Sequence, residues 1–253
     1  MAAARKPARI FDIRLNTPPG ITGRAYTTTT NPGRTSAEAA HGVTYARMSQ
    51  IRTTGLILAG GRSRRMGGRD KAFAPLAGRP LIAHVIERLA PQVDGLAISS
   101  NASAECFREF GLPVIADALT GFQGPLAGAH AGLVAYPGDY VVTVAVDLPF
   151  LPHTLVARLR ENLAPPDCAY AQSGVTHMPA ILWPPGLAQE LKRFLERGNR
   201  SLREWLAGHG RPVVFLPGAD DDVGCNINTP EDLARVETLF ATRARGDIRS
   251  SSG

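Results

Sequence analysis

A short apolar run that stops at a pair of glycines constrains the fold of this 253-residue chain more than any other feature. Residues 55–59 read Gly-Leu-Ile-Leu-Ala, and Gly60 and Gly61 follow directly. A run of this length and composition is typical of a buried strand, and the glycines indicate that the chain leaves the strand in a loop. The sequence therefore predicts a strand whose carboxyl end opens into a glycine-rich turn.

Further apolar runs alternate with helical patterns along the chain. Expected strands cover residues 96–98, 114–115, 140–146, 180–182 and 213–216. Expected helices begin near Pro80 and Pro125, cover 155–163, 187–197 and 202–206, and follow a cap at Thr229. Strands that alternate with helices are typical of a mostly parallel sheet with helices on both faces. We therefore expect an α/β protein with a Rossmann-like, three-layer arrangement.

The two ends of the chain differ in composition from the middle. Residues 1–47 are rich in Thr, Ala, Arg, Pro and Gly without any structural period, so we expect a disordered extension over residues 1–50. A flexible tail, a targeting segment and a translation-start artefact with Met48 as the first residue all fit, and we favour the tail or the artefact. One domain is expected over residues 51–242, with a disordered tail over 243–253.

Charge and cysteine content exclude several classes of protein. The net charge is +6, but residues 1–47 carry seven basic and two acidic residues, which leaves +1 for the rest of the chain. A nearly neutral domain does not favour nucleic-acid binding. No apolar stretch is long enough to span a bilayer. Three scattered cysteines, Cys106, Cys168 and Cys225, fit a reducing compartment, so we expect a cytoplasmic protein.

The loop after the first strand is suited to phosphate. Arg62, Arg64, Arg65 and Lys71 supply positive charge, and glycines let backbone N–H groups approach phosphate oxygens. The Gly-Lys-Ser/Thr of a Walker A loop and the spacing of the dinucleotide fingerprint are both absent. A glycine-rich surface turn with solvated arginines is the alternative, but the strand before the loop favours phosphate binding.

Polar side chains follow three of the expected strands. Asn101 follows the second strand, Asp117 the third and Asp147 the valine-rich run 140–146. The carboxyl ends of parallel strands share one edge of the sheet, where α/β proteins bind ligands. Mg²⁺ commonly takes one or two carboxylates together with phosphate oxygens, so Asp147 is the expected metal ligand. A turn residue at Asp117 or Asp147 and a helix cap at Asn101 are the structural alternatives.

The segment from Leu58 to Lys71 resembles the opening of the nucleotidyltransferase superfamily. Asp70, directly before Lys71, resembles the molybdenum cofactor guanylyltransferase family in particular. Further segments match that family in order, over about residues 52–240. They are Ser99–Asn101, Ile115–Asp117, Gly124–Gly128, Val146–Phe150 and Asn226–Glu231.

The resemblance implies a set of functional residues. It implies nucleotide contacts from Leu58, Ala59, Gly60, Gly61, Lys71, Asn101, Asp117 and Asp147, with Asp147 also holding Mg²⁺. It places guanine recognition near Gly124–Gly128 and acceptor binding at Asn226 and Asn228. His177 is expected on the acceptor side or as a structural group. Trp183 and Trp205 are expected in the core or at its rim rather than stacked on a cofactor.

The implied reaction is transfer of GMP from GTP to the phosphate of molybdopterin carrying its molybdenum, with pyrophosphate as the second product. A phosphate acceptor is already anionic, so the absence of a strong base is no obstacle. Lys71, Arg65 and Asp147 are the expected catalytic residues, with Arg64 a weaker candidate. We expect the backbone N–H groups of Ala59 to Gly61 to hold the triphosphate.

Other functions stay open at this point. The first loop also permits a cytidylyltransferase or a sugar-1-phosphate nucleotidylyltransferase, although Asp70-Lys71 and the segment Gly124–Gly128 favour the guanine branch. A noncatalytic nucleotide-binding protein is a further alternative, although Lys71 and Asp147 argue against it. We expect a monomer that makes transient contacts with molybdenum cofactor biosynthesis proteins and molybdoenzyme chaperones, and no contact with nucleic acid or membrane.

Overall fold

The computed structural model describes residues 52–60, 70–119, 124–173, 176–216 and 226–250, except for the side chains of 176–179 and 243–250. All of these residues belong to the compact unit Arg47–Gly253. The expected N-terminal extension over residues 1–50 lies outside the described residues. Within the described ranges, no helix combines the length and apolar character that crossing a membrane requires.

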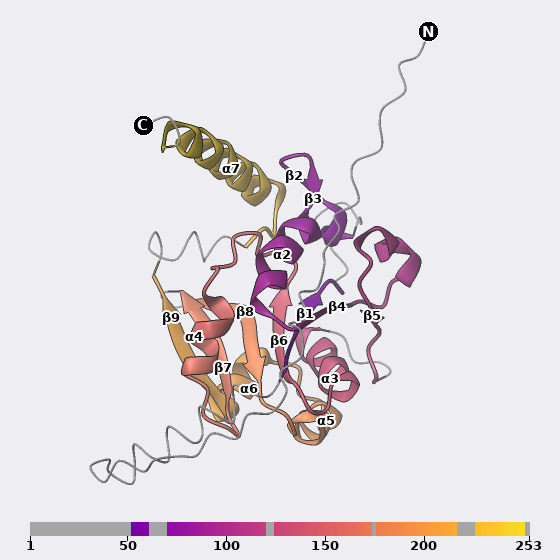
Figure 1. The fold of residues 1–253 in the computed structure, drawn as a ribbon. Helices are drawn as coiled ribbons and strands as arrows, with labels where there is room; N and C mark the ends of the chain where they lie inside the picture. The colour runs from indigo at the N-terminus through magenta and orange to yellow at the C-terminus, as the bar shows by residue number, and fades with distance from the viewer. Residues whose placement is uncertain (1–51, 61–69, 120–123, 174–175, 217–225, 251–253) are drawn as a thin grey trace, which may run out of the picture. The chain divides into compact units, whose positions relative to one another are not determined.

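A seven-stranded sheet forms the centre of the described part of the chain (Figure 1). Its strand order is β5-β4-β1-β6-β8-β7-β9, and only β8 runs antiparallel to its neighbours. A separate two-stranded hairpin joins β2 to β3. The strands are β1 (Thr53–Leu58), β2 (Pro75–Leu76), β3 (Arg79–Pro80), β4 (Gly95–Ser99), β5 (Val114–Ile115), β6 (Tyr140–Ala145), β7 (Cys168–Ser173), β8 (Thr176–Trp183) and β9 (Gly210–Phe215).

Helices cover both faces of the sheet, which confirms the expected three-layer α/β arrangement. Helices α2 and α4 pack on one face, and α3, α5 and α6 pack on the other. The helices are α2 (Leu81–Leu89), α3 (Pro125–Ala135), α4 (Leu155–Glu161), α5 (Ala188–Glu196), α6 (Leu202–His209) and α7 (Pro230–Ser250), with short 3-10 helices η2 (Lys71–Phe73), η3 (Ala90–Gln92) and η4 (Ala104–Phe110).

Alternation along the central strands builds the two cores. On β1, Ile57 points into the core under α2 and α4, whereas Leu56 points into the core under α3 and α5. Both side chains are fully buried, because a parallel strand covered on both faces exposes neither side to water. The second core contains Trp183 and Trp205, as the sequence predicted. Trp183 donates its indole N–H to the Thr143 hydroxyl at 2.9 Å.

A third, smaller apolar cluster fixes the C-terminal helix. Val236 of α7 is fully buried with Leu76, Leu81, Phe150 and Ile227. The predicted cap at Thr229 is confirmed, since its hydroxyl accepts a hydrogen bond from the Asp232 N–H at 3.2 Å. The first turns of α7 are therefore packed against β2, α2 and the loop after β6.

Two features differ from the sequence expectations. The expected disordered tail over 243–253 stays a prediction, whereas the backbone of α7 continues to Ser250 in the structure. Arg supplies three of the eight residues 243–250 and favours helix, and extending an already formed helix avoids the cost of nucleation. Strand β7 was not predicted, because its sequence Cys-Ala-Tyr-Ala-Gln-Ser lacks the β-branched residues typical of strands.

Candidate active site

The carboxyl ends of β1, β4, β5 and β6 meet at one edge of the sheet, which we call the carboxyl edge. Leu58 ends β1, and Ala59 and Gly60 follow it there. The Ala59 N–H donates to the Ser99 carbonyl oxygen at 2.9 Å, so it is not available to a triphosphate as the sequence analysis expected. Gly61, Arg65 and the other loop arginines lie outside the described residues.

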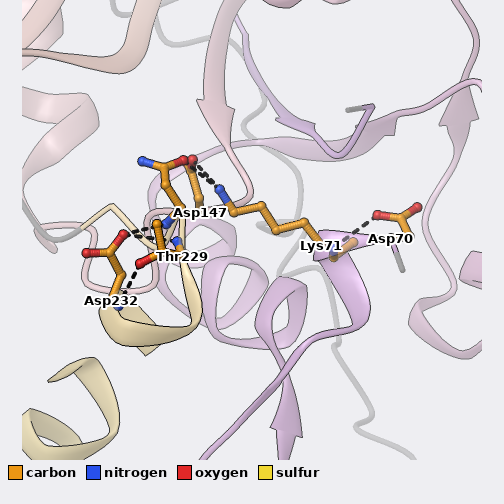
Figure 2. A network of polar contacts seen from close by, with 7 residues as sticks. Asp70, Lys71, Asp147, Thr229 and Asp232 are labelled. Atoms are coloured by element: carbon orange, nitrogen blue, oxygen red, sulfur yellow. Dashed lines mark hydrogen bonds and ion pairs between the residues drawn. The ribbon is translucent and has the colours of Figure 1, made fainter. Parts of the chain in front are cut away.

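Lys71 approaches the carboxyl edge from the short helix η2. Asp70 caps this helix, because its Oδ1 accepts a hydrogen bond from the Ala72 N–H at 3.0 Å. Burial raises the pKa of the Asp70 carboxyl above its ordinary value, against the effect of that hydrogen bond. Figure 2 shows the Lys71 side chain extending away from Asp70 and toward Asp147. Asp70 therefore sets the start of the helix that carries Lys71.

One ammonium group joins three distant segments of the chain. Lys71 Nζ donates to Asp147 Oδ2 at 2.9 Å and to Asn228 Oδ1 at 2.9 Å. Asp147 follows β6, and Asn228 precedes α7. The Lys71 and Asp147 side chains are only 15% and 16% exposed, so their ion pair is shielded from most of the solvent. The structure thus brings Lys71, Asp147 and Asn228 together at the carboxyl edge.

The second carboxylate oxygen of Asp147 has no such partner. Asp147 Oδ1 is buried and accepts no hydrogen bond from the described part of the chain. A buried carboxylate oxygen without a donor is costly, which is the situation expected of an atom that meets a ligand. Among the described residues, no group of three or more His, Cys, Asp or Glu side chains is arranged so that it could hold a metal ion.

Asn101 and Asp117 form a closed pair further along the same edge. Asn101 Nδ2 donates to Asp117 Oδ2 at 2.8 Å, and the Asp117 N–H donates to Asn101 Oδ1 at 2.9 Å. The two residues follow β4 and β5, as the strand pattern predicted. The reciprocal bonds fix one oxygen of the Asp117 carboxylate and orient the amide. A hydrogen-bonded pair of polar side chains therefore lies beside the strand that leads into the glycine-rich loop.

Helix α3 begins close to the same strands. Gly124, with a φ of 116°, precedes its first turn in a conformation that side chains rarely adopt. A Cβ at Gly128 would lie 2.7 Å from Ser99 Oγ and 2.9 Å from Leu58 Cδ2. Any larger residue here would force the Ser99 and Leu58 side chains to shift, so glycine lets the helix pack this near to β1 and β4. The structure therefore places the segment Gly124–Gly128 beside the ends of both strands.

The structure gives the backbone positions of two further predicted residues, His177 and Asn226, near this edge of the sheet. Ala180 of β8 pairs with Val144 of β6, so the preceding residues of β8, His177 included, extend past the carboxyl end of β6. The side chain of His177 is outside the description. Asn226 lies two residues before Asn228 and is half-buried. Neither residue is shown in contact with Lys71 or Asp147.

Two contacts at the site could not be found by sequence reasoning. The contact between Lys71 and Asn228 joins residues 157 positions apart. The Ile227 N–H donates to the Asp147 carbonyl oxygen at 3.2 Å, and the Ile227 side chain is fully buried. The only local signal was the cap at Thr229, which showed that a turn precedes α7 but not where that turn lies.

Comparison with known proteins identifies the family of this chain. Residues 55–213 match the family described as MobA-like NTP transferase domain. A molybdenum cofactor guanylyltransferase of Cereibacter sphaeroides is 46% identical over 194 residues, which cover 75% of this chain and 98% of that protein. One of Mesorhizobium japonicum is 42% identical over 197 residues, covering 74% and 95%. The chain belongs to the molybdenum cofactor guanylyltransferase family.

Members of this family are nucleotidyltransferases, and the fold agrees. The chain is similar to the crystal structure of molybdopterin-guanine dinucleotide biosynthesis protein A from Archaeoglobus fulgidus, with a TM-score of 0.62 and 24% identity, covering 75% of this chain and 99% of the other. It is also similar to CMP:2-keto-3-deoxy-manno-octonic acid synthetase complexed with CTP, with a TM-score of 0.60 and 15% identity, covering 76% and 99%. At these identities the likeness concerns the fold alone.

Proposed function

We propose that this chain transfers GMP from GTP to the phosphate of the molybdopterin-bound molybdenum cofactor and releases pyrophosphate. Membership of the guanylyltransferase family supports this reaction. One structural observation carries it: a single ammonium, Lys71 Nζ, lies 2.9 Å from both Asp147 Oδ2 and Asn228 Oδ1. This arrangement places the Lys71 ammonium and the unpartnered Asp147 Oδ1 at the same point of the carboxyl edge.

Lys71 supplies charge neutralisation. Its ammonium has three N–H donors, and two of them meet Asp147 and Asn228. We propose that the third meets an oxygen on the α-phosphate, where negative charge accumulates as the acceptor attacks. Fixed donors of this kind stabilise a transition state without reorganising, because the protein has already oriented them. Arg65 is proposed for the same role, and it lies outside the described residues.

Asp147 and Asn228 are the proposed ligands of Mg²⁺. The unpartnered Asp147 Oδ1 and the amide oxygen of Asn228 are the hard oxygen donors that this ion prefers. When bound, Mg²⁺ would neutralise and align phosphate oxygens of GTP. Asp147 is positioned for this by its place directly after β6, and by the Ile227 N–H that holds its carbonyl oxygen.

No residue has to remove a proton in this reaction. The acceptor phosphate carries negative charge near neutral pH, and one of its oxygens forms the new bond to the α-phosphorus. The bond from that phosphorus to the oxygen bridging the β-phosphate breaks, and pyrophosphate takes the electron pair. Catalysis then depends on alignment and charge neutralisation. We propose that the backbone amides that meet the triphosphate begin at Gly60, because the Ala59 N–H is used within the sheet.

The guanine base is proposed to lie between the Asn101–Asp117 pair and the start of α3. Asp117 Oδ2 already accepts from Asn101, so its other oxygen can face the N–H groups of guanine. Gly128 lets α3 pack against Ser99 and Leu58, and Gly124 leaves open space ahead of the first turn of the helix. We propose that a flat base lies against this open start of α3, and cytosine would offer a different set of donors to the same carboxylate.

Pyrophosphate release tests the proposal. The purified protein is incubated with Mg²⁺, molybdopterin carrying molybdenum and each nucleoside triphosphate in turn, and we expect release with GTP alone. Release with CTP, or with a sugar 1-phosphate in place of molybdopterin, would assign the chain to another branch of the superfamily. Tight binding of GTP with magnesium but without pyrophosphate from any acceptor would favour a noncatalytic nucleotide-binding protein.

A further inference from the structure

The turn before α7 is anchored to the loop that carries Asp147. Ile227 donates its N–H to the Asp147 carbonyl oxygen, and its side chain is buried with Phe150, Leu76 and Leu81. Phe240 of α7 stacks on Phe150, with ring centroids 4.7 Å apart. The helix and the turn before it therefore pack as one element against the carboxyl edge.

A carboxylate of the first turn of α7 holds the main chain of Asn228. Asp232 Oδ2 accepts from the Asn228 N–H at 2.9 Å and from the Thr229 N–H at 3.1 Å, and the Thr229 hydroxyl accepts from the Asp232 N–H. The hydrogen bond from Asn228 lowers the pKa of Asp232 below its ordinary value, so the carboxylate is charged near neutral pH. In Figure 2, Asp232 and Thr229 lie on the side of the turn away from Lys71.

Asn228 therefore connects two groups that do not touch each other. Its main-chain N–H is held by Asp232, and its side-chain oxygen accepts from Lys71 Nζ. If the turn moved, the ammonium would keep Asp147 as its acceptor and lose Asn228. Because the three N–H donors of an ammonium point in fixed relative directions, losing one acceptor frees the group to rotate and changes where the remaining donors point.

We propose that Asp232 is a positioning residue for nucleotidyl transfer, because it holds the Asn228 main chain where the Asn228 amide oxygen shares the Lys71 ammonium with Asp147. Asp232 acts through Asn228 and touches neither substrate nor metal. The effect on catalysis rests on the proposed function, whereas the effect on Lys71 does not. The alternative is that Asp232 is a helix cap that only stabilises α7. A positioning residue would change the orientation of the Lys71 ammonium when it is removed, whereas a purely structural cap would not.

A double-mutant cycle separates the two roles. Asp232→Ala is expected to lower kcat about tenfold with little change in the KM for GTP, since groups that orient a functional residue commonly have effects of this size. In the Asn228→Ala background the same substitution should change kcat by less than about twofold, because the residue it acts through is gone. Asp232→Glu keeps a carboxylate at the capping position and should restore most of the activity.

A second helix cap provides the matched control. Ser201 Oγ accepts from the Glu204 N–H at the start of α6, as Thr229 does on α7, but it has no contact with the turn at Asn228. Ser201→Ala should therefore lower thermal stability without lowering kcat. An equal loss of kcat in Ser201→Ala, or an undiminished loss from Asp232→Ala in the Asn228→Ala background, would overturn the proposal.

The NMR signal of the Lys71 ammonium tests the same proposal without any turnover. Asp232→Ala should shift it in the same direction as Asn228→Ala does, and Ser201→Ala should leave it in place. If the wild-type protein releases no pyrophosphate with GTP, the proposed function fails while this signal still decides the role of Asp232. A Lys71 signal unmoved by Asp232→Ala contradicts the positioning role, even in a fully active enzyme.

Discussion

An aspartate lies at each end of strand β6, and the two carboxylates differ in their hydrogen-bond partners. Asp139 precedes the strand, and its Oδ2 accepts from the Thr54 hydroxyl at 2.6 Å. Nearby, Asp94 Oδ2 accepts from the Thr53 N–H at 2.8 Å, so both carboxylates close the amino ends of strands with neutral donors of the protein. Asp147 follows the strand, pairs one oxygen with a cation and leaves the other without a donor among the described residues.

The difference shows what separates a structural carboxylate from a candidate functional one in the same sheet. At the amino edge, each carboxylate meets backbone or hydroxyl donors that belong to the neighbouring strand. At the carboxyl edge, Asp147 pairs with Lys71, which comes from the short helix η2, and Lys71 also donates to Asn228, which comes from near the far end of the chain. We infer that the amino edge contributes to stability and the carboxyl edge to chemistry, and substitutions at the two edges should separate these contributions.

The largest effect is expected at Asp147. Asp147→Asn keeps the shape of the side chain but removes its charge, so the proposed metal and Lys71 both lose a partner. We expect kcat for pyrophosphate release to fall by about 100-fold or more, the size of effect seen when a fixed electrostatic group is removed. Circular dichroism should show an unchanged fold. A rate within about threefold of wild type would remove Asp147 from the chemistry.

Lys71→Met should lower kcat by nearly as much as Asp147→Asn. Methionine keeps most of the length of the side chain and loses the ammonium, so the donor proposed for the α-phosphate disappears. We expect kcat to fall about 100-fold, and Lys71→Arg to recover only part of it because a planar guanidinium does not reproduce the ammonium geometry. Lys192→Met is the matched control. Lys192 forms an exposed pair with Glu196 on α5, so a comparable loss there would contradict a specific role for Lys71.

Asn101→Ala should act on nucleotide binding more than on the chemical step. The substitution removes both hydrogen bonds that orient Asp117, and we expect the KM for GTP to rise about tenfold while kcat changes less. Ser103→Ala serves as the control, since Ser103 caps η4 two residues further along without contacting Asp117. A fall in kcat at an unchanged KM would place the Asn101–Asp117 pair in the chemical step instead.

The smallest effect is expected at Asp139, the counterpart of Asp147. Asp139→Asn weakens a hydrogen bond to Thr54 at the start of β1 and should lower the free energy of unfolding by about 1 kcal/mol or less. Thermal unfolding should show a decrease in Tm of about 2–4 °C at most. Steady-state kinetics should show wild-type kcat. Loss of activity here would contradict the division between the two edges of the sheet.

Local patterns predicted much of the fold and part of the site. The continuous apolar runs of β1 and β6 identified both strands to within two residues, and Asp147, Asn101 and Asp117 were placed by their positions just after strands. This worked because a parallel strand buried on both faces has few alternatives to an uninterrupted apolar sequence. The side-chain roles proposed for these residues remain predictions.

Long-range contacts could not be predicted in the same way. Asn228 meets Lys71 only because α7 packs against β2, α2 and Phe150, and a packing choice of that kind leaves no periodic signal in the sequence. Strand β7 was missed because alternating alanines carry little strand preference, although its neighbours β8 and β9 force it into the sheet. The extension of α7 to Ser250 has no apolar period in the sequence, because residues 243–250 are mostly polar and only continue a helix that is already formed.

The central claim is that the triphosphate and its divalent ion bind together at Lys71 and Asp147. A crystal structure with GTP and Mn²⁺, which replaces Mg²⁺ and can be located by its anomalous scattering, tests this most directly. We expect the ion within ligand distance of an Asp147 oxygen and a phosphate oxygen in hydrogen-bond contact with Lys71 Nζ. An ion and triphosphate bound anywhere else, for example beside Asp94 and Asp139 at the amino edge, would contradict the account.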